Sequence, residues 1–255
     1  MLTPNSAQHP TGSAGRTAEF ETLSRELAER ELELATLESQ LSTFEGRYAR
    51  TVGILYAELD RLEKEIAKEL YRLHPDEKHK EGFHRAERKA KTSQDAIHDK
   101  MQQGEQKTFA PSDELRNLFR RVAKTIHPDL ATNERERAYR TSLMARANEA
   151  YKNEDMEALE RILYEWEHRD EKSFVEVPQL TEANRLEQKL LQIKARIKEI
   201  ETRIRELKQS DLYQLMIKVE QAELEGRDLL SAMAKDLQYQ IQSAQGLLDS
   251  LKQQG

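Results

Sequence analysis

The stretch DELRNLFRRVAKTIHPDLATNERERAYRTSLMARANEAYK, residues 113–152, decides the fold of the middle of the chain. In its first part, 113–126, apolar residues recur every three or four positions, which is typical of one buried stripe along a helix. Pro128 ends that helix, because proline lacks a backbone donor and restricts the residue before it. After the polar letters LATN, helical spacing resumes from 134 to 153. The sequence therefore predicts two helices joined by a rigid, exposed turn.

The two predicted helices each have a buried face. Ser112 or Asp113 can cap the start of the first helix, with Pro111 just outside it. We expect the shared core to be formed by Leu115, Phe119, Val122, Ile126, Met144, Ala147 and Tyr151. The polar face of the first helix has a positive stripe, made of Arg116, Arg120, Arg121 and Lys124. Such a stripe is either a docking surface or an ordinary solvated helix face.

A helix, the tripeptide His127-Pro128-Asp129 and a second helix together resemble the J-domain of DnaJ-type co-chaperones. The run Ala147-Asn148-Glu149-Ala150-Tyr151 is similar to the signature of the third J-domain helix. In that family the His-Pro-Asp loop and the basic second helix bind a DnaK-type chaperone and stimulate its ATPase. The resemblance therefore implies that His127, Pro128, Asp129 and the positive stripe bind such a partner.

The chain departs from the family where the first J-domain helix belongs. Residues 101–113 contain only Phe109 as a large apolar residue after Met101, so no first helix is recognisable. Two helices alone bury little surface, and another segment must cover them. We expect this cover to come from the segment after Asp155, where apolar residues recur at helical spacing up to the single tryptophan, Trp166.

A second tripeptide of the same composition, His74-Pro75-Asp76, also follows an apolar-periodic helix. The residues after it, EKHKEGFHRAERKAK, show no apolar stripe that could pack back on the preceding helix. We interpret this copy as a helix terminator, with Pro75 ending the helix. The alternative is a second contact site for a partner.

Apolar residues at heptad-like spacing predict long helical arms on both sides of the module. The first arm is expected over 18–76 and the second over 179–255, capped by Thr181 after Val177-Pro178. A change of phase at Ser210-Asp211 indicates either a stutter in one helix or the turn of a hairpin. The arms can pair within one chain, with another copy in a homo-oligomer, or with a protein client.

Composition bounds the class of protein. A charged fraction of 35% favours solvated helices over one large core, and the chain has no cysteine for disulfides or zinc ribbons. No apolar run is long enough to span a membrane, and the net charge of −6 argues against bulk affinity for nucleic acid. The expected location is cytoplasmic. No catalytic site, cofactor or metal site is predicted; the histidines at 74, 79, 84 and 98 are interpreted as solvated.

The sequence thus predicts an all-α protein in which coiled-coil helices flank a small, divergent J-domain-like module. The expected order is a disordered tail (1–17), the first arm (18–76), a polar linker (77–111), the module (112–170) and the second arm (179–255). Two functions remain open. One is a co-chaperone that recruits and stimulates a DnaK-type ATPase, with arms for oligomerisation or client binding. The other is a coiled-coil scaffold or adaptor with a degenerate J-like segment.

Overall fold

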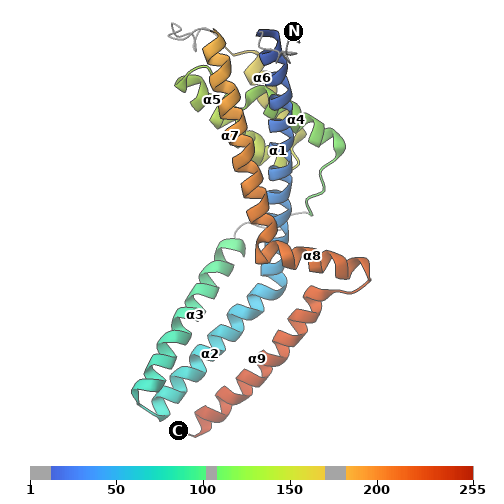
Figure 1. Cartoon of the computed structure of the whole chain (residues 1–255). Coiled ribbons are helices and arrows are strands. Elements are labelled where there is room, and N and C mark those ends of the chain that lie inside the picture. Colours follow the sequence, from blue (N-terminus) through green and yellow to red (C-terminus); the bar gives the residue numbers. More distant parts are fainter. Residues whose placement is uncertain (1–12, 102–107, 170–181, 255) are drawn as a thin grey trace, which may run out of the picture. The chain divides into compact units, whose positions relative to one another are not determined.

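The computed structural model of the chain describes residues 13–101, 108–169 and 182–254, and these are helical throughout apart from caps and short turns. The all-α prediction is confirmed for this part of the chain. The helices form two compact units, each built from two separate pieces of sequence. The first unit contains 1–39 and 109–209, and the second contains 40–108 and 210–255. Figure 1 shows the helices of each unit.

The first unit is a small helical module covered by two longer helices. The module consists of α4 (Asp113–Ile126), a 3-10 turn η2 (Pro128–Leu130), α5 (Glu134–Lys152) and α6 (Met156–Glu167). The longer helices are the N-terminal part of α1 (Ser13–Tyr48) and α7 (Glu182–Gln209). All seven residues expected in the core lie in one buried cluster, together with Phe109 and the apolar face of α6.

The helix α6 covers the α4 and α5 pair, as the sequence predicted. It contacts both helices, and Leu159, Ile162, Leu163 and Trp166 are buried in the common cluster. Asp155 caps α6 by accepting a hydrogen bond from the backbone N–H of Ala158 at 2.8 Å. Two arginines lie over the Trp166 ring, with the guanidinium carbons of Arg140 and Arg169 4.1 and 3.6 Å from its centroid.

The helix α1 contributes a second cover that the sequence did not predict. Ala28, Leu32 and Ala35 lie in the module's buried cluster, and Thr36 shares a hydrogen bond of 2.9 Å with the Tyr151 hydroxyl. The α4 and α5 pair is therefore covered by α1 as well as by α6.

The same helix also pairs with α7 in the parallel sense. Ion pairs join Glu19 to Lys194 at 2.7 Å and Glu33 to Lys208 at 2.9 Å, so residue numbers rise together along both helices. α7 has a continuous line of buried apolar residues, namely Leu190, Ile193, Ile197, Ile200 and Ile204. Pairing of the two arms occurs within one chain at this place (Figure 1); supercoiling of the pair stays a prediction.

The second unit contains the C-terminal end of α1 (residues 40–48) and five further elements. These are η1 (Ala49–Gly53, a π-helical turn), α2 (Ile54–Leu73), α3 (Glu77–Met101), α8 (Asp211–Leu224) and α9 (Leu229–Gln253). α2 packs against both α3 and α9. Residues 77–101 are therefore a packed helix and not a polar linker. The prediction failed because α3 attaches through small and polar contacts: Lys89 pairs with the buried Asp60 at 2.7 Å, and Ala90 is buried.

The phase change at Ser210 is a true break. The Ser210 hydroxyl accepts from the backbone N–H of Tyr213 at 3.3 Å and so caps α8, and the unit boundary falls at the same point. Gly226 then adopts φ +75° in the turn before α9. At the other end, helix α1 already begins at Ser13, so the expected tail is too long by five residues; its first twelve residues and Thr181 lie outside the described chain. None of the described helices combines the length and apolarity needed to cross a bilayer.

Candidate partner-binding site

The tripeptide His127-Pro128-Asp129 lies in the turn between α4 and α5. Ser112 caps α4 by accepting from the Leu115 N–H at 3.1 Å, which fixes where that helix begins. The helix ends at Ile126, and Pro128 opens the 3-10 turn that follows. Asn133 then caps α5 by accepting from the Glu136 N–H at 2.9 Å. Two caps and a proline therefore define the path of the turn.

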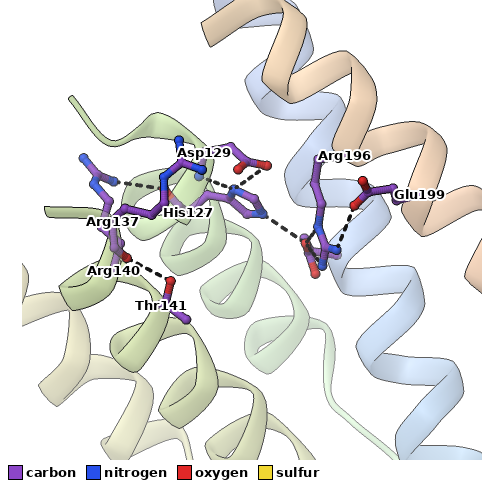
Figure 2. Close-up of polar contacts among 8 residues, drawn as sticks. His127, Asp129, Arg137, Arg140, Thr141, Arg196 and Glu199 are labelled. Carbon is purple, nitrogen blue, oxygen red and sulfur yellow. Dashed lines mark hydrogen bonds and ion pairs between the residues drawn. The ribbon is translucent and has the colours of Figure 1, made fainter. Parts of the chain in front are cut away.

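The side chain of His127 is buried, with only 3% of its surface exposed, so the expectation of an exposed loop is wrong for this residue. Its Nδ1 accepts a hydrogen bond from the backbone N–H of Asp129 at 3.1 Å, which leaves the ring hydrogen on Nε2. That Nε2 donates to the carboxylate of Glu31, on α1, at 3.0 Å. Both ring nitrogens are therefore engaged inside the protein. Figure 2 shows the imidazole with Asp129 beside it and Arg196 opposite.

Glu31 is the central partner of this arrangement. Arg196, on α7, donates to the same carboxylate oxygen from Nε at 3.1 Å and from Nη2 at 3.0 Å. Burial raises the pKa of Glu31, but the hydrogen bond from His127 and the charge of Arg196 outweigh burial and hold that pKa below 4.5. Burial likewise lowers the pKa of Arg196, and the charge of Glu31 more than restores it. The buried carboxylate is therefore ionised at neutral pH and joins α1, α7 and the turn.

A second network holds the turn from the side of α5. The guanidinium of Arg140 donates to the carbonyl oxygens of Thr125 at 2.9 Å and His127 at 3.3 Å. It also pairs with Glu136 at 2.8 Å, and Glu136 accepts from both the backbone N–H and the hydroxyl of Thr132. Burial raises the pKa of Glu136, but the bonds from Thr132 and Arg140 bring it below the usual value. The backbone of the turn is thus fixed by charged hydrogen bonds at both ends.

The positive stripe on α4 is largely paired with acidic side chains. Arg120 contacts Glu29 at 2.6 Å and Lys124 contacts Glu21 at 3.1 Å, and both glutamates belong to α1. Arg116 pairs with Asp113 of its own helix at 3.5 Å. Arg121 is exposed. Of the predicted site residues, the structure therefore brings His127, Arg120 and Lys124 together against α1.

The other two residues of the turn remain accessible. Pro128 and Asp129 are half-buried and line a cleft with a cavity volume of about 530 Å³ between the module and α7. The opposite wall of this cleft includes Gln192, Arg196 and Glu199. The Asp129 carboxylate lies 3.8 Å from His127 Nδ1. A partner can thus reach Pro128 and Asp129 while His127 stays covered.

The second tripeptide has different surroundings. His74, Pro75 and Asp76 are all exposed at the turn between α2 and α3. The Asp76 carboxylate accepts from the backbone N–H of His79 at 2.9 Å and contacts its ring at 2.8 Å, so it caps α3. The interpretation as a helix terminator agrees with this geometry, but the helix after it does pack back on α2, contrary to the expectation.

Sequence reasoning missed the residues that cover the site, above all Glu31 and Arg196. The sequence contained a signal for Glu31. This residue lies four positions after Leu27, where the helical spacing of apolar residues predicts another apolar residue. A second signal was the spacing of Ala28, Leu32 and Ala35, which marks a second apolar face on α1. Small residues made that face easy to overlook.

No protein-family model matches this chain, and no curated protein or solved structure matches it significantly. The interpretation of the site therefore depends on its residues and their geometry.

Proposed function

We propose that this chain is a J-domain co-chaperone that recruits a DnaK-type chaperone and stimulates its ATPase. The turn His127-Pro128-Asp129 and the stripe of Arg116, Arg120, Arg121 and Lys124 form the partner-binding site. The helical arms bind a protein client or a second copy, and the chain itself is not an enzyme. This function places the protein in the cytoplasm, with the chaperone.

One observation carries the proposal. The His-Pro-Asp turn joins α4 and α5, which pack on each other, and a basic face lies directly before the turn on α4. Asp129 supports it further, because its carboxylate caps no helix; Asn133 does that instead. A turn that needed only to end one helix and begin the next would not need this aspartate.

The test is the steady-state ATPase of a DnaK-type chaperone from the same organism. The wild-type chain is expected to raise the rate, and His127→Gln is expected to bring it back to the basal rate. The matched control is His74→Gln, the same change in the other copy of the tripeptide, which is expected to stimulate like the wild type. Equal stimulation by both variants would reject the assignment of the site to residues 127–129.

A second candidate is supported by the burial of His127. If the turn serves only to join α1, α7 and the module through Glu31, the chain is a helical scaffold and the tripeptide is internal. In that case no variant of the chain stimulates the ATPase, while His127→Gln lowers the stability of the first unit. The ATPase and an unfolding curve of the same variant therefore separate the two functions.

A further inference from the structure

We propose that α1 occupies the partner-binding site as an internal competitor, so that a DnaK-type chaperone must displace it in order to dock. The inference rests on the proposed function and adds its regulation. The competing surface consists of three carboxylates of one helix, which contact two cations of α4 and His127.

Two ion pairs and one hydrogen bond carry this inference. Glu21, Glu29 and Glu31 of α1 contact Lys124 at 3.1 Å, Arg120 at 2.6 Å and His127 at 3.0 Å. These three partners are drawn from the residues assigned to docking. Each can serve α1 or another protein, but not both at once with the same atoms. An acidic patch on a partner would therefore compete directly with α1.

The apolar part of the contact is small enough to be broken. α1 supplies three of the eighteen residues in the buried cluster, and two of these, Ala28 and Ala35, are alanines. The remaining fifteen belong to residues 109–166, so most of the cluster is formed within the module itself. The outer ion pairs are half-exposed, with Glu21 and Glu29 each 55% exposed, so each adds little to the free energy of the contact.

Covering by α1 also explains why the site is not uniformly hidden. Pro128, Asp129 and Arg121 remain accessible, whereas His127 is sealed. A partner can form a first contact with the accessible residues and then replace the glutamates one by one. Glu31 also binds Arg196 of α7, so displacing Glu31 breaks a contact between α1 and α7 as well.

The release of α1 can be followed with a thiol probe, since the chain contains no cysteine. In Ala28→Cys the new thiol lies between α1 and the module, where the alanine is 4% exposed. We expect Glu21→Lys combined with Glu29→Lys to speed labelling of this thiol about tenfold, because two attractions become repulsions. The same pair should stimulate the ATPase at a lower concentration than the wild type does. Trp166 fluorescence checks that the module stays folded.

The matched control is Glu19→Lys combined with Glu38→Lys. Glu19 and Glu38 pair with Lys194 and Arg203 of α7 and not with cations of α4. The control replaces two glutamates of α1 by lysines, as the first variant does, so both variants change the net charge by the same amount. The control should leave both labelling and stimulation close to wild type. If it enhances stimulation as much as the first pair, the effect comes from net charge and the inference fails.

A reversible cross-link completes the test. Arg120 contacts both Glu29 and Asn117, so Glu29→Cys with Asn117→Cys places two thiols within reach of a short, reductively cleavable bismaleimide. The cross-linked chain should not stimulate the ATPase, and cleavage should restore stimulation.

Full stimulation by the cross-linked chain would overturn the competition by α1 and leave the proposed function intact. Absence of stimulation before cross-linking, after cleavage and in the released variant would instead overturn the proposed function, and the regulation with it.

Discussion

The chain contains the same tripeptide twice, and the two copies differ in almost every contact. His127 is sealed between Asp129 and Glu31, whereas His74 is exposed. The Asp76 carboxylate caps the next helix, whereas Asp129 does not cap one. The same three residues therefore have different structural roles, and the residues that surround each copy determine its role.

The basic residues before the two turns differ in the same way. On α2, Lys68 and Arg72 pair with glutamates of their own helix, at positions 65 and 69. On α4, Arg120 and Lys124 pair with glutamates of a helix far away in sequence. The ion pairs on α2 stabilise a single helix, whereas the ion pairs on α4 connect two helices. This contrast is one argument for the proposal that residues 127–129, and not 74–76, bind the partner.

The largest expected difference between the copies is in stability. His127→Ala should lower the free energy of unfolding of the first unit by about 2–3 kcal/mol, because Glu31 and the Asp129 N–H lose a buried partner. His74→Ala should change stability by less than about 0.5 kcal/mol, because the side chain is exposed.

Urea unfolding measures this difference. Trp166, the only tryptophan, is buried in the first unit, and its fluorescence follows that unit alone. Circular dichroism follows the whole chain and so includes α2 and α3. Equal losses of unfolding free energy in the two variants would show that the buried His127 stabilises the protein no more than the exposed His74 does.

The next difference is a dependence on pH. The pKa of Glu31 is lowered on folding, so its stabilising effect is complete above its unfolded pKa near 4.5 and is lost as the pH falls through the folded pKa. Glu31→Gln should cost about 1–2 kcal/mol at pH 7 and progressively less at acid pH. Urea midpoints of wild type and variant, followed by Trp166 between about pH 7 and pH 3, should therefore converge. Midpoints that stay a constant interval apart would argue against an ionised Glu31 at the site.

The two helices around the tripeptide were predictable, and the burial of His127 was not. The apolar spacing of 113–126 and 134–152 placed two helices and their core, because a helix with one apolar stripe must bury it. The sequence offered Ser112 or Asp113 as the cap of α4, and a stutter or a turn at Ser210-Asp211. In the structure the hydroxyls of Ser112 and Ser210 both cap helices by accepting from free N–H groups. These are local signals, and a single sequence contains them.

The covering helix depended on a contact between residues about a hundred positions apart. Nothing near His127 in the sequence indicates that Glu31 will reach it, and Arg196, which binds the same carboxylate, lies 165 positions from Glu31. α3 was missed for a related reason: its contact face is formed by alanine, serine and a lysine that reaches a buried aspartate. Hydropathy patterns detect large apolar faces and pass over such faces.

A smaller effect distinguishes the two aspartates. Asp76→Ala should lower the unfolding midpoint by about 2–4 °C, because α3 loses its N-cap, while Asp76→Asn should keep it, because asparagine caps as well. Asp129→Ala should leave the midpoint almost unchanged and abolish stimulation of a DnaK-type ATPase. Thermal unfolding and the ATPase, measured on all three variants, give this crossed pattern. Loss of stimulation in Asp76→Asn would assign partner binding to the second copy as well.

The smallest expected effect concerns the ion pairs over the positive stripe. Glu29→Gln should destabilise the first unit by no more than about 0.5 kcal/mol, because Arg120 and Glu29 are 38% and 55% exposed and water replaces the lost contact. The difference from wild type should vanish near about 0.5 M NaCl, where such pairs are screened.

The matched change on α2, Glu69→Gln, removes the partner of Arg72 within one helix and should show the same dependence on salt. Both are measured by urea unfolding, with Trp166 fluorescence for the first and circular dichroism for the second. Of these two variants, only Glu29→Gln should also lower the concentration at which the chain stimulates the ATPase, because Glu29 contacts Arg120, a residue proposed to bind the chaperone, and Glu69 does not. Enhanced stimulation by Glu69→Gln would show that the basic residues before the two turns are equivalent, and the distinction between the two copies of the tripeptide would then rest on the histidines and aspartates.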